Sequence, residues 1–211
     1  MKNIFVAAAV SVLSSVAIAE GPSWTYVSVG FVAGDSSDEY KDGNLSGHSF
    51  NASAQLSDTF HARIDYADVD WNEEDSSEGH TLALGIHSAL TDNTDLVVEF
   101  VHSSYDFEEN NENEGDGYDG YGMNVGLKSM FTDKLELSAG VSYRDLELDI
   151  ELSDDAEGER QITTYFGGQY FVNENMGVGI DYSEFDVQTT DDFGSIGILN
   201  VYVRWSLGGA L

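Results

Sequence analysis

A histidine and a serine close together are the first residues of this sequence that could do chemistry. His102 and Ser104 are two residues apart, so on a β-strand both side chains lie on the same face. A histidine base beside a serine nucleophile is the combination used in ester hydrolysis. However, no carboxylate that would orient the histidine is identifiable from the sequence. We interpret the pair as polar residues at the point where a strand leaves a membrane.

Two further histidines, His48 and His80, lie among aspartates and glutamates, a setting compatible with peptide hydrolysis. Because acids are so frequent in these segments, a carboxylate near some histidine is expected by chance. We therefore assign no catalytic residue and expect no enzymatic activity.

Oxygen-rich segments are candidates for weak divalent-cation binding. The candidate ligands are Glu112, Glu114, Asp116, Asp154 and Asp155. The first three are spaced as in an EF-hand loop, but position twelve of that loop would be Met123, where a bidentate glutamate is required. The sequence thus predicts no specific metal site and no cofactor. Loosely bound Ca²⁺ or Mg²⁺ and an unoccupied solvated loop both remain open.

The elements that position these side chains are β-strands, because apolar residues recur with a period of two in ten segments. The segments are 25–32, 50–56, 60–66, 82–90, 96–100, 121–131, 135–143, 161–171, 177–185 and 199–207. Most approach the roughly 9 to 11 residues with which a tilted strand crosses a bilayer. No segment after the N-terminus has the roughly 18 consecutive apolar residues of a transmembrane helix. The pattern predicts a closed antiparallel up-and-down β-barrel of about ten strands.

The N-terminus has the pattern of a cleaved signal peptide. Lys2 precedes an apolar stretch over 4–16, and small residues at 17–19 form a cleavage site before Glu20. A membrane anchor is the alternative, but the stretch is too short to span comfortably. We predict a signal peptide over 1–19 and a barrel domain over 20–211.

Composition excludes several classes of partner and site. The chain has 39 Asp and Glu against 8 Lys and Arg, giving a formal net charge of −31, and no cysteine. Nucleic acid is excluded as a partner because phosphate binding needs clustered basic residues. Disulfides and thiolate metal sites are excluded by the missing cysteines.

The connections between the strands are of two kinds. Four short turns, at 56–59, 90–93, 131–134 and 171–174, carry Ser, Thr, Asp and Asn, which bond the nearby backbone. The five longer connections, 35–46, 68–79, 106–119, 145–159 and 186–195, hold 28 of the 39 acids. One rim therefore has short turns and the other long acidic loops, as in transmembrane barrels.

The alternating faces indicate which side of the barrel meets lipid. A soluble barrel, with its apolar face inside, is the alternative. Here aromatic residues lie on the apolar face near both strand ends, as in the girdles of membrane barrels: Phe60, Tyr66, Tyr121, Phe131, Tyr143 and Trp205. The opposite face carries most of the strand glycines and eight charged residues: Arg63, Asp65, Glu99, Lys128, Glu136, Arg144, Asp181 and Arg204. We predict that these charges form an ion-pair network that fills the lumen; a continuous channel is the alternative.

The signal peptide, the ten short strands, the repeated Ser/Thr-Asp turns and the end of the last strand, 202–207, resemble small proteobacterial outer-membrane barrels. The chain is most similar to the family regulated by a diffusible signal factor, and more loosely to OmpA/OmpX-type barrels. The resemblance implies outer-membrane location, contact with lipid and lipopolysaccharide, and insertion by the barrel-assembly machinery. It also implies a final strand ending in an aromatic residue, whereas residues 208–211 follow the last strand here.

We expect a monomer with a structural or surface-interaction role. The alternatives are a narrow porin-like diffusion channel and, third, a lipid A or peptide hydrolase.

Overall fold

The computed structural model describes residues 22–37, 42–71, 75–108, 117–149, 158–188 and 193–207. The predicted signal peptide and the five candidate cation ligands, Glu112, Glu114, Asp116, Asp154 and Asp155, lie outside these ranges. The described chain forms ten strands: β1 (Tyr26–Ser37), β2 (Asp42–Gln55), β3 (Phe60–Asp70), β4 (Ser76–Thr91), β5 (Thr94–Glu108), β6 (Gly117–Thr132), β7 (Leu135–Asp149), β8 (Gly158–Asn173), β9 (Met176–Gln188) and β10 (Phe193–Ser206).

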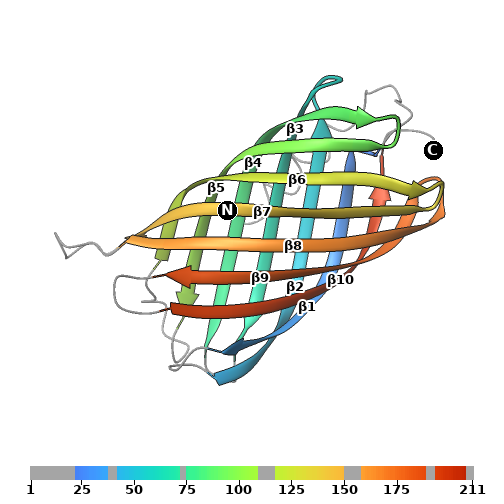
Figure 1. Cartoon of the computed structure of the whole chain (residues 1–211). Helices are drawn as coiled ribbons and strands as arrows, with labels where there is room; N and C mark the ends of the chain where they lie inside the picture. Colours follow the sequence, from blue (N-terminus) through green and yellow to red (C-terminus); the bar gives the residue numbers. More distant parts are fainter. Residues whose placement is uncertain are drawn as a thin grey trace.

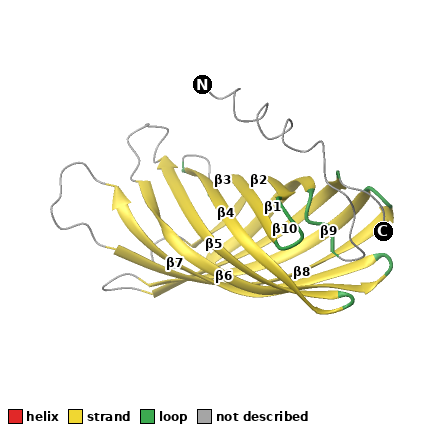
Figure 2. Cartoon of the chain, turned by 90° about the horizontal axis from the view of Figure 1, so that it is seen from above, coloured by secondary structure: helices red, strands yellow, loops and turns green. Residues whose placement is uncertain are grey.

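Each strand pairs antiparallel with its neighbours in the sequence, and β1 pairs with β10 to close the barrel. Figures 1 and 2 show the strands wrapping obliquely around one axis, with the short turns gathered at one end. The predicted ten-stranded up-and-down barrel is confirmed. Within the described ranges, no helix is long and apolar enough to cross a membrane.

The strands are longer than the alternating pattern indicates, and the extra length lies at the acidic rim. β4 has 16 residues and begins at Ser76, inside a segment predicted as a loop. β6 begins at Gly117 and β7 continues to Asp149, again inside predicted loops. The reason is physical: ladder hydrogen bonds do not depend on side-chain polarity, and in these segments the buried positions hold apolar residues such as Leu45, Val69 and Leu146, so the sense of the alternation is reversed and it no longer marks the strand. The strand boundaries predicted at the acidic rim are therefore wrong by several residues.

The short turns use side-chain oxygens to bind backbone N–H groups. Between β6 and β7, the backbone N–H groups of Lys134 and Leu135 donate to Thr132 Oγ1 over 3.2 and 3.0 Å. Between β8 and β9, the backbone N–H groups of Asn175 and Met176 donate to Asn173 Oδ1 over 2.9 and 3.0 Å. This is the turn chemistry that the repeated Ser/Thr/Asn-containing segments predict.

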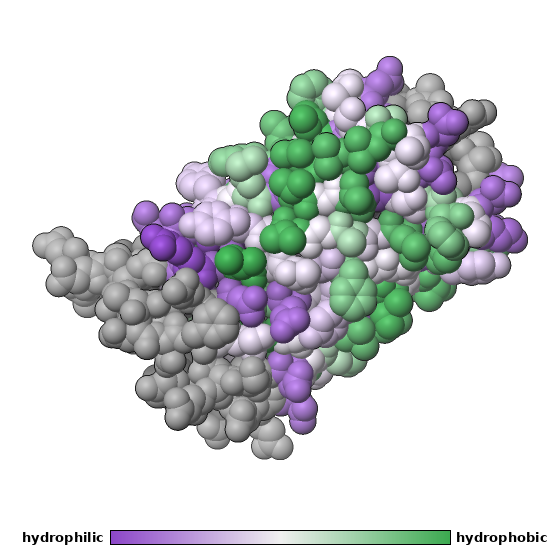
Figure 3. Space-filling view, in the orientation of Figure 1, coloured by the Kyte–Doolittle hydropathy of each residue, from purple (hydrophilic) through white to green (hydrophobic). Residues whose placement is uncertain are grey.

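Large apolar side chains face outward over the middle of the barrel. On β4, Leu82 and Leu84 are 51% and 57% exposed, while Ala83 between them is buried. On the face drawn in Figure 3, hydrophobic side chains cover a broad area of the wall, and hydrophilic ones are frequent near its ends. The six aromatic residues predicted as girdles, Phe60, Tyr66, Tyr121, Phe131, Tyr143 and Trp205, are on outward strand positions. Such an exterior is suited to hydrocarbon and unsuited to water, so the barrel is a transmembrane one.

The free-energy cost of a charged side chain on this exterior should depend on its depth in the bilayer. Val141, on β7, is 49% exposed in the apolar band, and Glu147 is on the same face of the same strand beyond the girdle residue Tyr143. Val141→Arg should lower the free energy of unfolding in phospholipid vesicles by about 2–4 kcal/mol, and Glu147→Arg by about 0–1 kcal/mol. Urea titration of both variants measures this; equal losses would contradict the placement of the membrane.

Candidate functional site: a polar network in the lumen

Inward-facing glycines leave room for the polar side chains of the lumen. A Cβ atom on Gly85 would lie 2.5 Å from His61 Cε1 and 2.7 Å from Glu99 Cγ. Gly177 is in the same situation beside Gln169. A barrel of ten strands is narrow, so long inward side chains fit only where their neighbours are small. The predicted concentration of glycine on the polar face thus has a structural role.

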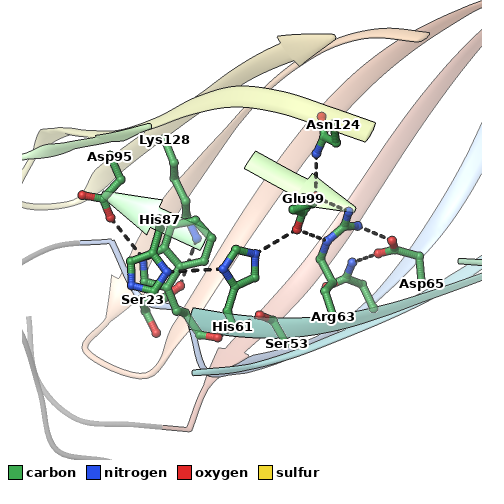
Figure 4. A network of polar contacts seen from close by, with 12 residues as sticks. Ser23, Ser53, His61, Arg63, Asp65, His87, Asp95, Glu99, Asn124 and Lys128 are labelled. Carbon is green, nitrogen blue, oxygen red and sulfur yellow. Dashed lines mark hydrogen bonds and ion pairs between the residues drawn. The ribbon is translucent and has the colours of Figure 1, made fainter. Parts of the chain in front are cut away.

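The carboxylate of Glu99 is the most heavily bonded group of the lumen. Arg63 binds it through two hydrogen bonds, from Nε over 3.0 Å and from Nη2 over 2.7 Å. Asn124 Nδ2 donates to it over 2.6 Å, and His61 Nε2 lies 2.9 Å away (Figure 4). Glu99 is only 3% exposed, so these partners replace the water that a buried carboxylate loses.

Arg63 extends the network towards the acidic rim. Its guanidinium also donates to Asp65 (Figure 4). Asp65 accepts a further hydrogen bond from Asn51. Three of the charged residues predicted for the lumen, Arg63, Asp65 and Glu99, are therefore in direct contact.

A second ion-paired group lies nearer the short turns. Arg204 Nη1 donates to Glu136 Oε1 over 2.8 Å, and Lys128 Nζ lies 3.5 Å from the same oxygen. Arg204 also stacks on Tyr26, with the guanidinium carbon 3.6 Å from the ring centroid. All three charged side chains are less than a tenth exposed. The lumen thus contains two separate groups of paired charges.

Arg144 and Asp181 have neutral partners rather than the charged ones predicted for them. Arg144 Nη1 donates to Gln161 over 2.9 Å and to Thr163 over 3.3 Å. Asp181 accepts from the Tyr202 hydroxyl over 3.5 Å. In both cases the neighbouring strand presents an uncharged residue at the opposed position. The structure therefore brings six of the eight predicted residues into ion pairs among the described residues.

The residue that sequence reasoning missed is Trp24, which precedes β1 and turns into the lumen at the short-turn end. Its indole Nε1 donates to Asp95 over 3.0 Å, and its ring stacks on His87 with centroids 4.4 Å apart. Ser53 Oγ donates to its backbone oxygen over 2.8 Å. Lys128 Nζ lies 4.4 Å from the Trp24 ring centroid.

The backbone before Trp24 is fixed by the same basic residues that pair with Glu136. The Ser23 carbonyl accepts from Lys128 over 2.9 Å and from Arg204 over 2.5 Å. We call Ser23 and Trp24, with their contacts His61, His87 and Asp95, the turn-side plug. Figure 4 labels Ser23, His61, His87 and Asp95. The inward parity of His61, His87 and Asp95 was readable from the alternation, but the inward turn of the preceding segment was not.

Exposure falls steadily along the hydrogen-bonded chain from the acidic rim to the plug. The side chains of Asp65 and Arg63 are 31% and 20% exposed, although both face inward. Glu99 is 3% exposed, and His61 is completely buried. Solvent therefore reaches the side chains of Asp65 and Arg63 but not that of His61.

Apolar side chains pack inside the barrel near the acidic rim. Val32, Leu45 and Val69 form a buried cluster, against which Ile196 and Ile198 pack from β10. The charges predicted for the lumen lie at mid-strand positions, and this end of the lumen is apolar instead.

The remaining histidine candidates are all on outward strand positions. His48 contacts the ring of Phe31, with centroids 5.9 Å apart, and His80 is exposed. His102 Nε2 lies 3.4 Å from Asp119 Oδ2, so a carboxylate does accompany this histidine. Across the described part of the chain, no three His, Cys, Asp or Glu side chains are arranged to hold a metal ion.

At the level of sequence, no protein-family model and no curated protein matches the chain. Among solved structures, the barrel is similar to the outer membrane protease OmpT from Escherichia coli, at 10% identity over 86% of this chain and 96% of that chain, with a TM-score of 0.49. It is also similar to an outer membrane channel from Pseudomonas putida F1, at 10% identity over 87% and 96%, with a TM-score of 0.49. It is similar as well to Neisserial surface protein A, at 14% identity over 87% of this chain and 97% of that chain, with a TM-score of 0.39.

These similarities carry no argument about activity, and the class of the protein follows from the barrel itself. A closed antiparallel sheet leaves no edge in hydrocarbon, its exterior is apolar, and most of its inward charges are paired. The chain is a small outer-membrane β-barrel protein.

Two arginines of the lumen, Arg63 and Arg144, allow a matched test of the network. Arg63→Ala leaves the buried Glu99 without its cation and should lower the free energy of unfolding by about 3–5 kcal/mol. Arg144→Ala removes hydrogen bonds to neutral groups only and should cost about 0.5–1.5 kcal/mol per hydrogen bond lost. Urea unfolding in vesicles compares the two. Adding Glu99→Gln to Arg63→Ala should recover part of the loss; no recovery would show that the charge of Glu99 is not what Arg63 stabilises.

Proposed function

We propose that this protein is a non-conducting outer-membrane barrel with a structural or surface-interaction role. The observation that carries the proposal is the turn-side plug, in which Trp24 fills the lumen at the level where His61 is completely buried. Ions crossing this level would have to displace the indole and break the contacts of Lys128 and Arg204 with Ser23. If the lumen is closed, the outer surface and the acidic rim are the parts of the protein through which it interacts with other molecules.

The acidic rim supports the surface-interaction part of the proposal. Most of the net charge of −31 comes from the segments that connect the strands at this rim. In barrels of this kind the longer loops face the outside of the cell. We propose outer-membrane lipid and lipopolysaccharide as the immediate surroundings, the barrel-assembly machinery as the partner during insertion, and a monomeric state. Membership of the family regulated by a diffusible signal factor is likewise proposed, from the resemblance of the sequence.

A narrow diffusion channel is the second candidate, and one observation favours it. Asp65 and Arg63 are partly exposed although they face inward, so the half of the lumen towards the acidic rim is not completely filled. A channel would need this space to continue past Glu99, which is 3% exposed. The closed barrel therefore accounts better for the contacts.

Planar-bilayer recording separates the two candidates. The wild-type protein should show no steady conductance, and Trp24→Ala should show brief openings because the plug has lost its ring. The folded state of both proteins is checked by the shift in electrophoretic mobility on heating. A steady, ohmic current through the folded wild-type barrel would contradict the closed-lumen proposal and establish the channel.

The acidic loops should respond to cations in one of two ways. If divalent ions bridge carboxylates, millimolar CaCl₂ should raise the melting temperature of the refolded barrel more than NaCl of the same ionic strength. If the loops are only screened, the two salts should be equivalent, since the Debye length depends on ionic strength alone and falls to about 3 Å at 1 M. We expect modest bridging. A melting temperature that is insensitive to both salts would contradict both mechanisms.

A further inference from the structure

The turn-side plug contains two histidines whose ring nitrogens face each other. His61 Nδ1 lies 3.3 Å from His87 Nδ1, and both side chains are buried (Figure 4). On the other side of its ring, His61 Nε2 lies 2.9 Å from Glu99 Oε1. The other three histidines of the chain are on outward strand positions. His61 and His87 are therefore the histidines that can respond to protons inside the barrel.

The contact between the two rings limits the number of protons that they can hold. A hydrogen bond needs one N–H and one lone pair, and a neutral imidazole has one of each. The carboxylate of Glu99 accepts from His61 Nε2, so with both rings neutral His61 Nδ1 is the acceptor and His87 Nδ1 carries the proton. One extra proton can be held on His61 beside Glu99, with His61 Nδ1 then donating to His87. Two extra protons cannot be held, because both Nδ1 atoms would then be donors that face each other.

The charges around the two rings are balanced without these extra protons. The charged side chains at this end of the lumen are three acids and three bases: Arg63 of β3, Asp95 and Glu99 of β5, Lys128 of β6, Glu136 of β7 and Arg204 of β10. Tyr26 of β1, beside Lys128 and Arg204, is neutral in the range where histidines titrate. Two imidazolium ions would therefore leave an excess of positive charge in a buried site, which is unfavourable.

Trp24 is the part of the plug that can move without breaking the sheet. Its ring is stacked on His87 with an interplanar angle of 8°, and it lies against His61 with ring centroids 4.5 Å apart. The next residue, Thr25, is fixed to the wall: its backbone oxygen accepts from the Leu207 N–H over 2.9 Å, and its hydroxyl from the Gln55 N–H over 3.1 Å. Trp24 itself precedes β1. Separation of the two histidine rings would remove the surface on which its indole packs.

We propose that the turn-side plug is an acid-operated gate. At neutral pH the contact between His61 and His87 holds Trp24 in the lumen, and the barrel is closed. In acid both rings are protonated and separate, Trp24 leaves the lumen, and small ions pass. This inference rests on the proposed closed lumen and adds the condition under which it opens. Since the short turns of such barrels face the periplasm, the gate responds to the acidity of the periplasm.

The sign of the pH dependence follows from proton binding. A histidine in water binds a proton below about pH 6.5, whereas the closed pair holds at most one extra proton. In acid the open state therefore binds at least one proton more than the closed state. The ratio of open to closed barrels should rise by about tenfold for each pH unit and each such proton. Opening is thus favoured as the pH falls and is lost above about pH 6.5.

Planar-bilayer recording of the refolded mature barrel at about pH 7.5 and about pH 4.5 tests the gate. The wild type should be closed at the higher pH, and its open probability should be about tenfold greater, or more, at the lower pH. His87→Asn should stay closed at both, because its amide can still donate to His61 Nδ1 but binds no proton. His61→Gln, whose amide can still donate to Glu99, is a second variant that should stay closed.

The matched control uses the outward histidines. A variant that combines His48→Asn, His80→Asn and His102→Asn loses three titratable rings and keeps the plug, so it should open in acid like the wild type. Loss of acid opening in this variant would overturn the assignment of the gate to His61 and His87. Acid opening that is as large in His87→Asn and His61→Gln as in the wild type would also overturn it, because carboxylates would then be responsible.

The outcomes separate this inference from the proposed function. A steady current through the wild type at the higher pH contradicts the closed lumen, and the gate with it. A folded barrel that is closed at both pH values agrees with the closed lumen and overturns the gate alone.

Fluorescence follows the movement of the indole directly. With Trp71→Phe and Trp205→Phe, Trp24 is the only tryptophan of the chain. Between the same two pH values its emission maximum should shift to longer wavelength and its quenching by acrylamide should increase, while the heat-shifted electrophoretic mobility shows that the barrel stays folded. Adding His87→Asn should remove both changes. A Trp24 signal that does not change in acid overturns the proposal, even if a current appears.

Discussion

The pairing of β1 with β10 is the interaction on which the rest of this structure depends. In hydrocarbon no water is present to bind an unpaired backbone N–H or C=O, and each unsatisfied group costs several kcal/mol. An open sheet of ten strands would leave two such edges in the membrane. Closure removes both edges at once. It also creates a narrow tube whose inner face is shielded from lipid and, around Glu99 and His61, from water.

The narrow tube explains why the interior combines glycines with charges. Charges are costly to bury, and the desolvation penalty is offset only when every charge is paired and hydrogen-bonded. Glu99 meets this condition with Arg63, His61 and Asn124 around one carboxylate. Gly85 makes the arrangement possible, because any side chain there would occupy the space of His61 and Glu99. The polar network and the glycines therefore depend on each other: the long polar side chains fill the narrow lumen, and the glycines leave the space that these side chains need.

The sequence predicts which residues face the lumen and which face lipid, because side chains alternate between the two faces of a strand. Alternation assigns Arg63 and Glu99 to the inside and the girdle aromatics to the outside, because one residue of slip would exchange the two faces. It fails near the acidic rim, where apolar residues such as Leu45 and Val69 are buried on the inner face, and this is why the strands extend into segments predicted as loops. It also fails for Trp24, because that residue precedes the first alternating strand and its position depends on contacts with Lys128 and Asp95, more than seventy residues away.

Alternation does not identify the neighbour across the ladder, and the contacts in the lumen and on the outer face both depend on that neighbour. His102 and Asp119 are on different strands, 17 positions apart in the sequence, and they meet only because the register sets Ser104 against Asp119. Arg144 shows the opposite case: it had the same inward parity as Arg63, but β8 presents Gln161 and Thr163 to it, so it gained no charged partner. Parity selects the face of a strand on which chemistry is possible. The register between strands then determines which side chains meet there, and therefore which chemistry the face supports.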